Sequence, residues 1–285
     1  IDRSRGLGDV YKRQDQGYGD IGYNGNPHLI TPNLDKFAGE SIRFNNFNVS
    51  PVCAPTRSSL LTGRYSLRTG VTDTYNGGAI MSSNEITLAE IFSENNYKTG
   101  IFGKWHLGDN YPSRPSDQGF QESLIHLSGG IGQVGDFTNY YKGSTSYYDP
   151  ILWLNNKQEK YNGYCSDIFT DEAIKFIEEN KDNQFFCYLS FNAPHTPLQV
   201  PEKYYQMYKD IDPTNINGES LEMTEKNILD AKKIYGMVTN IDENFGKLIN
   251  KLDELNLKEN TIVIFMTDNG PQQPRYVSNL KGLKS

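Results

Sequence analysis

The feature of this sequence that most restricts its fold is a long apolar stripe that is followed at once by a short apolar run. Between about Thr224 and Leu255, apolar side chains recur at alternating steps of four and three, the period of a helix with one buried face. Its members are Ile234, Val238, Ile241, Phe245, Leu248, Leu252 and Leu255. A bare coiled coil would show the same stripe. The strand-sized run from Thr261 to Thr267 follows within a few residues, however, and favours a helix packed on a sheet.

The same succession of helix and strand occurs earlier in the chain. Thr31-Pro32 predicts the start of a short helix with a capping hydroxyl, and Thr87-Leu88-Ala89-Glu90 is typical of a capping box. Ser166 precedes a third helical pattern, and strand-sized runs follow at 99–102 and 185–191. This alternation predicts an α/β fold with a largely parallel, mixed central sheet and helices on both faces.

Composition and charge exclude several classes of function. The 285 residues suit one large domain, and 28 Lys and Arg against 35 Asp and Glu leave a formal charge of −7 with no basic run. We therefore expect no nucleic-acid partner. The longest apolar runs are strand-sized, so we expect no membrane span. Three scattered cysteines are too few for a disulfide framework or a thiolate metal cage.

The stretch 129–164 differs from the rest, because it is rich in Gly, Tyr, Asn and Ser and contains Trp153. We predict an irregular excursion or a hairpin. Its aromatic side chains could stack on sugar rings, but packing of the excursion onto the domain is the favoured interpretation.

Charged or metal-ligating side chains follow three of the predicted strands. Lys104 and His106 come after the first, His195 after the second, and Asp268 with Asn269 after the third. In an open α/β sheet, ligands bind beyond the carboxyl ends of the strands, so we expect these residues to share one cleft. The oxygens of Asp268 and Asn269 suit Ca²⁺ or Mg²⁺ and not zinc, although an isolated Asp-Asn-Gly is also typical of a plain turn.

Cys53 stands in an unusual local setting. Pro55 suits the first turn of a helix, which places Cys53 at a helix N-terminus, where the helix dipole stabilises negative charge. Arg57 lies one turn further along the same side. A lone cysteine of this kind is either a buried apolar residue or a low-pKa thiolate nucleophile, and the spacing alone leaves both open.

Five motifs in register resemble the sulfatase family. The stretch from Cys53 to Arg57, with Leu60-Leu61-Thr62-Gly63-Arg64 after it, resembles the main sulfatase signature, and Gly103-Lys104-Trp105-His106-Leu107-Gly108 resembles the second one. The remaining motifs are Asp15-Gln16-Gly17-Tyr18-Gly19-Asp20, Asn192-Ala193-Pro194-His195-Thr196-Pro197 and Thr267-Asp268-Asn269-Gly270-Pro271. The resemblance covers 15–284 and implies an alkaline-phosphatase/sulfatase-like fold.

The resemblance implies a modified residue at Cys53. In sulfatases the motif cysteine is oxidised to formylglycine by a formylglycine-generating or sulfatase-maturating enzyme, which would be a partner of this protein. The hydrated aldehyde has two hydroxyls, of which one attacks sulfur and the other, on losing its proton, expels sulfate. The expected substrate is a sulfate ester, on a small molecule or, by family habit, on a saccharide.

A metal site is implied at Asp15, Asp268 and Asn269, with Ca²⁺ as the expected ion and Mg²⁺ as the alternative. The metal would lower the pKa of the attacking hydroxyl and bind a sulfate oxygen. The family usually has two successive aspartates where this chain has Gln14-Asp15. If Gln14 is genuine, one metal carboxylate is missing and the site should bind metal more weakly.

The resemblance also implies roles for five other residues. Lys104 and Lys284 would neutralise the charge of the sulfate, and Arg57 would orient the nucleophile. His106 would be the base, and His195 the acid that protonates the departing oxygen or a donor that orients it.

Several expectations concern the chain as a whole. We expect residues 1–14 to be a non-native leader and 15–285 to be a truncated sulfatase catalytic domain without the smaller C-terminal domain. Export to the periplasm or the medium is expected from family habit. The alternatives to a sulfatase are a phosphonate or phosphate monoester hydrolase of the same superfamily, and a non-catalytic carbohydrate-binding relative.

Overall fold

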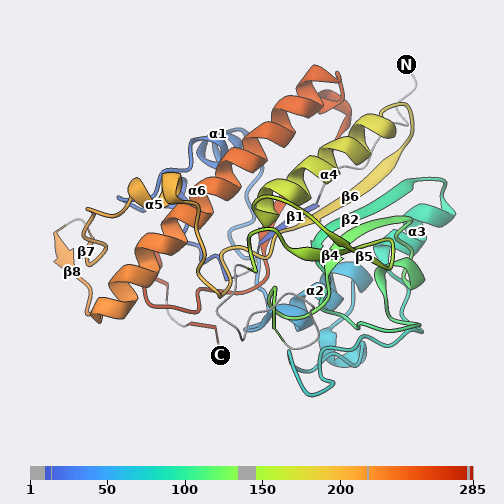
Figure 1. Cartoon of the computed structure of the whole chain (residues 1–285), viewed down its shortest axis with the longest axis horizontal. Coiled ribbons are helices and arrows are strands. Elements are labelled where there is room, and N and C mark those ends of the chain that lie inside the picture. Colours follow the sequence, from blue (N-terminus) through green and yellow to red (C-terminus); the bar gives the residue numbers. More distant parts are fainter. Residues whose placement is uncertain (1–9, 14, 134–145, 217, 281–282, 285) are drawn as a thin grey trace.

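The central element is a sheet of seven strands in the order β5-β4-β3-β2-β6-β1-β9 (Figure 1). The computed structural model describes residues 10–13, 15–133, 146–216, 218–280 and 283–284. The strands are β1 (Val10–Arg13), β2 (Lys98–Lys104), β3 (Glu122–His126), β4 (Ile151–Leu154), β5 (Lys157–Lys160), β6 (Phe185–Ser190) and β9 (Ile264–Thr267). All pairs from β3 to β9 are parallel, and β4 and β5 form an antiparallel hairpin at one edge. The predicted mixed, largely parallel sheet is confirmed.

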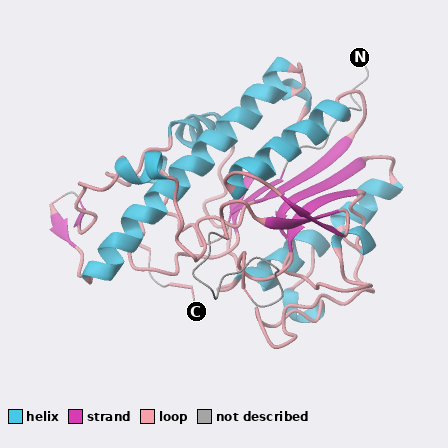
Figure 2. Cartoon of the chain, in the orientation of Figure 1, coloured by secondary structure: helices cyan, strands magenta, loops and turns pink. Residues whose placement is uncertain are grey.

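Helices cover both faces of this sheet (Figure 2). Helices α1 (Pro32–Glu40), α4 (Cys165–Glu179) and α6 (Glu225–Glu254) share one apolar cluster, and α2 (Cys53–Thr62) and α3 (Leu88–Glu94) share another. Smaller elements are α5 (Glu202–Gln206), the hairpin β7 (Asn215–Ile216) and β8 (Glu219–Ser220), and short 3₁₀ turns at Gly22–Asn24, Ser66–Arg68, Pro115–Asp117 and Lys258–Asn260. The prediction of helices on both faces is confirmed.

Alternate residues of β6 show how one strand serves both layers. Cys187 and Leu189 enter the cluster beneath α4 and α6, whereas Phe186 and Tyr188 enter the cluster beneath α2 and α3. All residues of β6 are buried. A strand that is buried on both faces reads as a continuous apolar run, which explains why the sequence shows no alternation there.

Most of the predicted helix boundaries are confirmed. Thr87 and Glu90 form the expected capping box of α3, and the hydroxyl of Thr224 caps α6 by accepting from Asn227 N. Two details were wrong. Helix α4 begins at Cys165, so Ser166 lies inside it, and the Thr31 hydroxyl makes no cap bond to α1 because it donates to Asp35 Oδ1.

The N-terminal segment contributes β1, for which the sequence showed no usable periodicity. Val10–Arg13 lie between β6 and β9 and pair with both strands in parallel. Strand β1 ends just before Asp15 and so places this residue at the carboxyl edge of the sheet. A site that includes Asp15 requires such a strand, because ligands of an open α/β sheet bind at that edge. That residues 1–14 are a non-native leader stays a prediction, and Gln14 lies outside the described residues.

The aromatic stretch packs onto the domain over the part that is described. Strands β4 and β5 form the predicted hairpin, and Trp153 packs against the cluster beneath α2 and α3. Tyr147 and Tyr164 are buried in the cluster beneath α4 and α6. Residues 134–145 of this stretch lie outside the described part.

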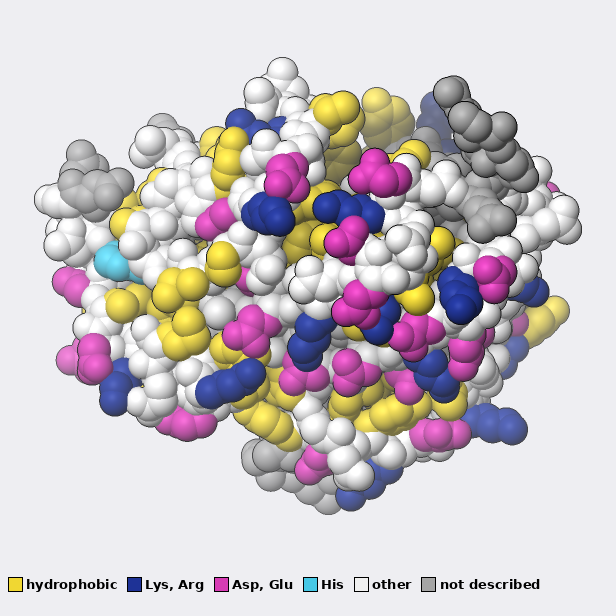
Figure 3. Space-filling view, turned by 90° about the horizontal axis from the view of Figure 1, so that it is seen from above, with side chains coloured by type: hydrophobic (Ala, Val, Ile, Leu, Met, Phe, Trp, Pro, Cys, Tyr) yellow, Lys and Arg dark blue, Asp and Glu magenta, His cyan; other side chains and the backbone are white. Residues whose placement is uncertain are grey.

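None of the described helices is both long and apolar enough to cross a membrane. On the face of the molecule in Figure 3, basic and acidic side chains are interspersed and form no basic patch.

Candidate active site

The predicted site residues come together at the carboxyl ends of the parallel strands. Lys104 ends β2, and His106 follows it; His195 follows β6, and Asp268 follows β9. Cys53 is the first residue of α2, whose N-terminus faces the same region. Segments far apart in the sequence therefore meet because parallel strands deliver their carboxyl ends to one edge.

The sulfur of Cys53 lies 3.4 Å from Nδ1 of His106. The other ring nitrogen of His106, Nε2, lies 2.9 Å from the carbonyl oxygen of Thr74. A carbonyl can only accept, so Nε2 carries the proton and Nδ1 presents its lone pair to Cys53. Burial, together with the nearby charge of Lys104, holds the pKa of His106 well below its ordinary value of 6.5. The imidazole is therefore a neutral base that points at Cys53.

Arg57 is fully buried and bridges three strands. Its Nη1 donates to the Lys104 carbonyl at 2.8 Å and to Ser190 Oγ, and its Nε donates to Asp268 Oδ2 at 3.2 Å. Nη2 lies 3.1 Å from the same carboxylate oxygen but has no hydrogen-bond acceptor among the described residues. Arg57 thus ties α2 to β2, β6 and β9 and keeps one donor free.

Lys104 places an ammonium group beside this cysteine and histidine. Its Nζ donates to the carbonyl oxygen of Gly129, and the side chain is fully buried. Burial lowers the pKa of Lys104 to about 8, and Arg57 adds to that effect. Lys104 is a desolvated cation that lacks a carboxylate partner at salt-bridge distance among the described residues.

The buried oxygens without a hydrogen-bond donor among the described residues include one from each predicted metal residue: Asp15 Oδ2, Asp268 Oδ1 and Asn269 Oδ1. Buried oxygens of this kind are rare, and an absent ion is one of the few explanations for them. Carboxylate and amide oxygens are the ligands that Ca²⁺ and Mg²⁺ prefer. The residues therefore fit the predicted metal. The set contains two carboxylates and one amide, and the described part of the chain has no group of three His, Cys, Asp or Glu side chains that could hold a metal ion.

Asp15 joins the predicted metal residues to Lys284 and His195. Its Oδ1 accepts from Lys284 Nζ at 2.8 Å and from Asn269 Nδ2 at 2.7 Å. Its Oδ2 lies 3.8 Å from His195 Nε2. Burial acts to raise the pKa of Asp15, but His195, Lys284 and the hydrogen bonds outweigh it, and the pKa is lowered. Asp15 is therefore a carboxylate at neutral pH.

His195 is neutral in this arrangement. Its Nδ1 donates to the Thr196 carbonyl at 2.7 Å, and burial lowers its pKa to about 4 although Asp15 opposes the shift. The proton lies on the nitrogen that points away from Asp15. The predicted role as an acid therefore requires uptake of a proton at Nε2, which the negative charge of a bound substrate would favour.

Arg275 and Asp20 support the site, and no role for Arg275 was found in the sequence. Arg275 Nε and Nη2 bind the Asp20 carboxylate, and Nη2 also donates to the backbone oxygen of Asp15 at 2.6 Å. Both side chains of the pair are fully buried. The sequence does contain one signal for Arg275. Asp20 is the last residue of the motif that begins at Asp15, and a buried carboxylate needs a buried cationic partner.

Two glycines after β3 lie close to the rings of His106 and His195. A Cβ on Gly129 would lie 2.9 Å from His106 Cε1, and a Cβ on Gly130 would lie 2.8 Å from His195 Nδ1. Any side chain at either position would displace a ring or the backbone. Sequence reasoning placed these residues in the irregular excursion and missed their role as spacers.

Tyr147 fixes the loop that carries His195. Its hydroxyl donates to the His195 carbonyl at 2.6 Å and accepts from Asn192 Nδ2 at 2.6 Å. The excursion therefore supplies a buried support for the site, in addition to packing on the domain.

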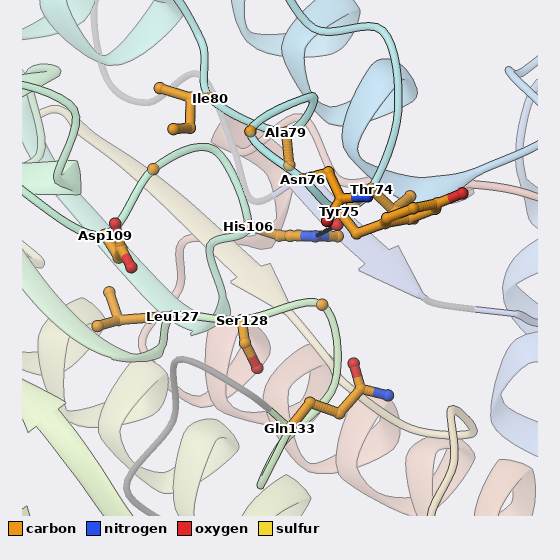
Figure 4. A pocket seen from close by; sticks show the side chains of 13 residues that line it. Thr74, Tyr75, Asn76, Ala79, Ile80, His106, Asp109, Leu127, Ser128 and Gln133 are labelled. Atoms are coloured by element: carbon orange, nitrogen blue, oxygen red, sulfur yellow. Dashed lines mark hydrogen bonds between the residues drawn. The ribbon is translucent and has the colours of Figure 1, made fainter.

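A cavity of about 610 Å³ opens beside His106 (Figure 4). It is lined by Thr74, Tyr75, Asn76, Gly77, Ala79, Ile80, His106, Gly108, Asp109, Leu127, Ser128, Gly129 and Gln133. His106 therefore both contacts Cys53 and lines this space.

The family assignment follows from the comparison with known proteins. The sequence model of the Sulfatase family matches residues 14–283, which is nearly the whole chain. This chain belongs to the sulfatase family. The residues that resemble the family's motifs lie at the ends of the strands of this chain.

Among curated sulfatases, the chain is similar to the ulvan-active sulfatase of Formosa agariphila, with 32% identity over 275 residues. That match covers 92% of this chain and 50% of the relative. The mouse N-acetylgalactosamine-6-sulfatase is 30% identical over 277 residues, and the match covers 90% of this chain and 48% of the relative. The chain spans about half the length of the curated relatives it matches.

Among solved structures, Ps i-CgsB in complex with k-i-k-neocarrahexaose resembles this chain with a TM-score of 0.77 and 31% identity, over 94% of this chain and 59% of that one. Phosphonate monoester hydrolase of Agrobacterium radiobacter shares the fold, with a TM-score of 0.64 and 18% identity, over 93% of this chain and 62% of that one. The α/β architecture of this sulfatase is thus common to both proteins.

Proposed function

We propose that this chain carries the catalytic site of a sulfuric ester hydrolase that acts on sulfated carbohydrates. The observation that carries the proposal is the position of Cys53, at a helix N-terminus and 3.4 Å from a neutral imidazole nitrogen. The named relatives that act on saccharides support the substrate class.

Two groups would complete the site. Formylglycine made from Cys53 would supply, as its hydrate, a nucleophile with a second hydroxyl from which a proton can be taken. A Ca²⁺ or Mg²⁺ ion held by Asp15, Asp268 and Asn269 would supply positive charge next to the nucleophile and the sulfate. The three orphaned oxygens of these residues support the metal.

The charges of the site's other side chains indicate their roles. Three cationic groups would bind the oxygens of the sulfate: Lys104, Lys284 and the free Nη2 donor of Arg57. Their positive charge would stabilise the negative charge that develops during the reaction. His106 would take a proton at Nδ1, since Nε2 is already bonded to Thr74. His195 would face the departing oxygen with Nε2, which needs a proton for that role.

The modification is tested by intact mass. Expressed as its complete gene product with a maturating enzyme, the protein is expected to lose about 18 Da, because the thiol sulfur and two hydrogens are lost and one carbonyl oxygen is gained. The Cys53→Ala variant should show no such loss and no desulfation. An unmodified thiol in a competent host would contradict the proposal and favour a non-catalytic carbohydrate-binding relative.

A phosphonate or phosphate monoester hydrolase is the second candidate, because the shared fold and a cationic site suit both esters. Aryl sulfate and aryl phosphate with the same leaving group separate them. We expect faster turnover of the sulfate, and faster turnover of the phosphate would overturn the choice. Dependence on a maturating partner and export from the cytoplasm stay predictions.

A further inference from the structure

Arg57 and Asp268 are in contact, but the contact leaves one polar atom of each side chain unused. Arg57 Nε and Nη2 both approach the same carboxylate oxygen, Asp268 Oδ2, at 3.2 and 3.1 Å. Among the described residues, Nη2 has no acceptor and the other oxygen, Asp268 Oδ1, has no donor. Both side chains are fully buried, so each unused atom costs free energy.

A guanidinium and a carboxylate usually avoid this cost by pairing as a fork, in which two N–H groups donate to two different oxygens. A fork between Arg57 and Asp268 would join Nη2 to Oδ1 and satisfy both atoms. The pair instead shares a single oxygen. Another group must therefore hold the guanidinium in the observed position.

The remaining nitrogen of the guanidinium, Nη1, is held by two acceptors. It donates to the Lys104 carbonyl at 2.8 Å and to Ser190 Oγ at 2.5 Å. The carbonyl belongs to the backbone at the end of β2. Among the described residues, Ser190 is thus the one side chain besides Asp268 that is hydrogen-bonded to Arg57.

The backbone of Ser190 is fixed from both sides. This residue is the last of β6, and it pairs with Gly103 of β2 and with Lys12 of β1. A Cβ on Gly103 would lie 1.9 Å from the Ser190 carbonyl oxygen, which shows how closely the two strands approach each other. Phe186 and Tyr188 enter the cluster beneath α2 and α3, and the alternation of a strand directs Ser190 to the same side. Its hydroxyl is therefore a rigid anchor beneath α2.

We propose that Ser190 is a positioning residue that keeps Arg57 on one oxygen of Asp268, so that Oδ1 stays available to the metal and Nη2 stays available to the sulfate. The inference rests on the proposed function, because the ion and the sulfate both belong to that proposal. Ser190 acts through Arg57 and not by contact with either group.

Loss of the Ser190 hydroxyl would let the guanidinium turn into the fork with Asp268. The fork occupies both carboxylate oxygens, so a metal ion would have to displace Arg57 from Oδ1 before it could bind. Residues that orient metal ligands without touching the metal typically change its affinity by about 10- to 100-fold when they are replaced. A hydroxyl that served only packing would have no such effect on the metal.

The test measures calcium binding to the complete protein by titration calorimetry, without substrate. We expect Ser190→Ala to weaken calcium binding by about tenfold. Ser58→Ala is the matched control, because it removes another buried serine hydroxyl, which donates to the Pro55 carbonyl at 2.9 Å on the same helix as Arg57. The control should bind calcium as the wild type does. Equal binding by Ser190→Ala and the wild type would overturn the inference.

A double-mutant cycle separates an effect through Arg57 from a general effect on the fold. In the Arg57→Met background no guanidinium competes for Asp268, so Ser190→Ala should leave calcium affinity unchanged there. A loss of the same size in that background would overturn the inference, because Ser190 would then act independently of Arg57.

A second measurement decides the matter if Arg57→Met does not fold. In a crystal structure of metal-free Ser190→Ala, we expect Arg57 Nη2 within hydrogen-bond distance of Asp268 Oδ1. A guanidinium that still contacts Oδ2 alone would overturn the inference.

The outcomes also distinguish this inference from the proposed function. If the wild type binds neither Ca²⁺ nor Mg²⁺, the metal part of the proposed function and the role of Ser190 fail together. If the wild type binds calcium but shows no mass loss at Cys53 and no desulfation, the proposed function fails and the calcium comparison still decides the role of Ser190. If desulfation is found and Ser190→Ala binds calcium normally, only the role of Ser190 fails.

Discussion

Arg275 Nη2 lies 2.5 Å from Asp20 Oδ2, and the two side chains are completely buried. The same guanidinium donates to the backbone oxygen of Asp15, the first residue of the metal set. Asp20 in turn accepts from the Gly17 backbone N–H at 2.7 Å. A buried ion pair thus fixes the loop that carries Asp15, a predicted metal ligand.

Loss of Arg275 should therefore affect both stability and metal binding. We expect Arg275→Met to lower the free energy of unfolding by about 3–5 kcal/mol, because it leaves the Asp20 charge buried and unpaired. The double variant Arg275→Met with Asp20→Asn should recover part of this loss in chemical denaturation. A single variant within about 1 kcal/mol of the wild type would contradict a structural role for the pair.

Removal of one metal ligand should reduce the stabilisation that calcium provides. The wild type should melt at a higher temperature in Ca²⁺ than in chelator, since an ion that binds the folded state stabilises it. Asn269→Ala should reduce this rise, with each tenfold loss of affinity worth about 1.4 kcal/mol. The exposed Asn183→Ala serves as the control. An identical calcium response in Asn269→Ala and the wild type would count against the predicted ligand set.

A methyl group on Gly129 should displace His106. Because the added Cβ would lie 2.9 Å from His106 Cε1, Gly129→Ala should lower kcat by roughly 100-fold, which is the scale of misplacing a catalytic group. Gly39→Ala on α1 is the control, since its Cβ would make ordinary contact with Tyr23. Circular dichroism and thermal melting should show that both variants fold. Full activity in Gly129→Ala would show that the close approach is not needed.

The pKa of Lys104, which burial lowers to about 8, predicts a pH dependence of anion binding. Below that pH the ammonium group is charged and attracts sulfate, and above it the group is neutral and the attraction is lost. We expect the inhibition constant of inorganic sulfate to rise as the pH passes from 7 to 9. Lys104→Met should bind sulfate weakly at every pH and lose this step. A flat profile for the wild type over this range would contradict the prediction.

Sequence patterns predicted the structure correctly where the interacting residues are close along the chain. The capping box of Thr87 and Glu90 and the stripe of α6 are set by spacings of three and four residues, which local backbone geometry determines. The Thr31 cap failed because its hydroxyl is engaged by Asp35 and by the Gly22 N–H, and the latter is a tertiary contact.

The structure brings together the residues that the motifs indicated, but their contacts could not be found from the sequence. Motif residues at strand ends indicated Lys104, His106, His195 and Asp268, because parallel strands send their carboxyl ends to one edge. The sequence alone did not show that Thr74 fixes the tautomer of His106, since Thr74 belongs to no motif. Gly129 and Gly130 were missed for a related reason. They matter because they have no side chain where the rings of His106 and His195 approach them.

The sequence by itself determined the α/β class, the helix faces, the motif residues that follow the strands and the shortage of basic charge, since each depends on neighbours along the chain or on composition. The tertiary structure decided which of these residues touch. Lys284 reaches Asp15 across 269 residues, and Arg275 reaches Asp20 across 255. Contacts at such separations depend on the order of strands in the sheet, which is set by the packing of the whole domain and not by any local pattern.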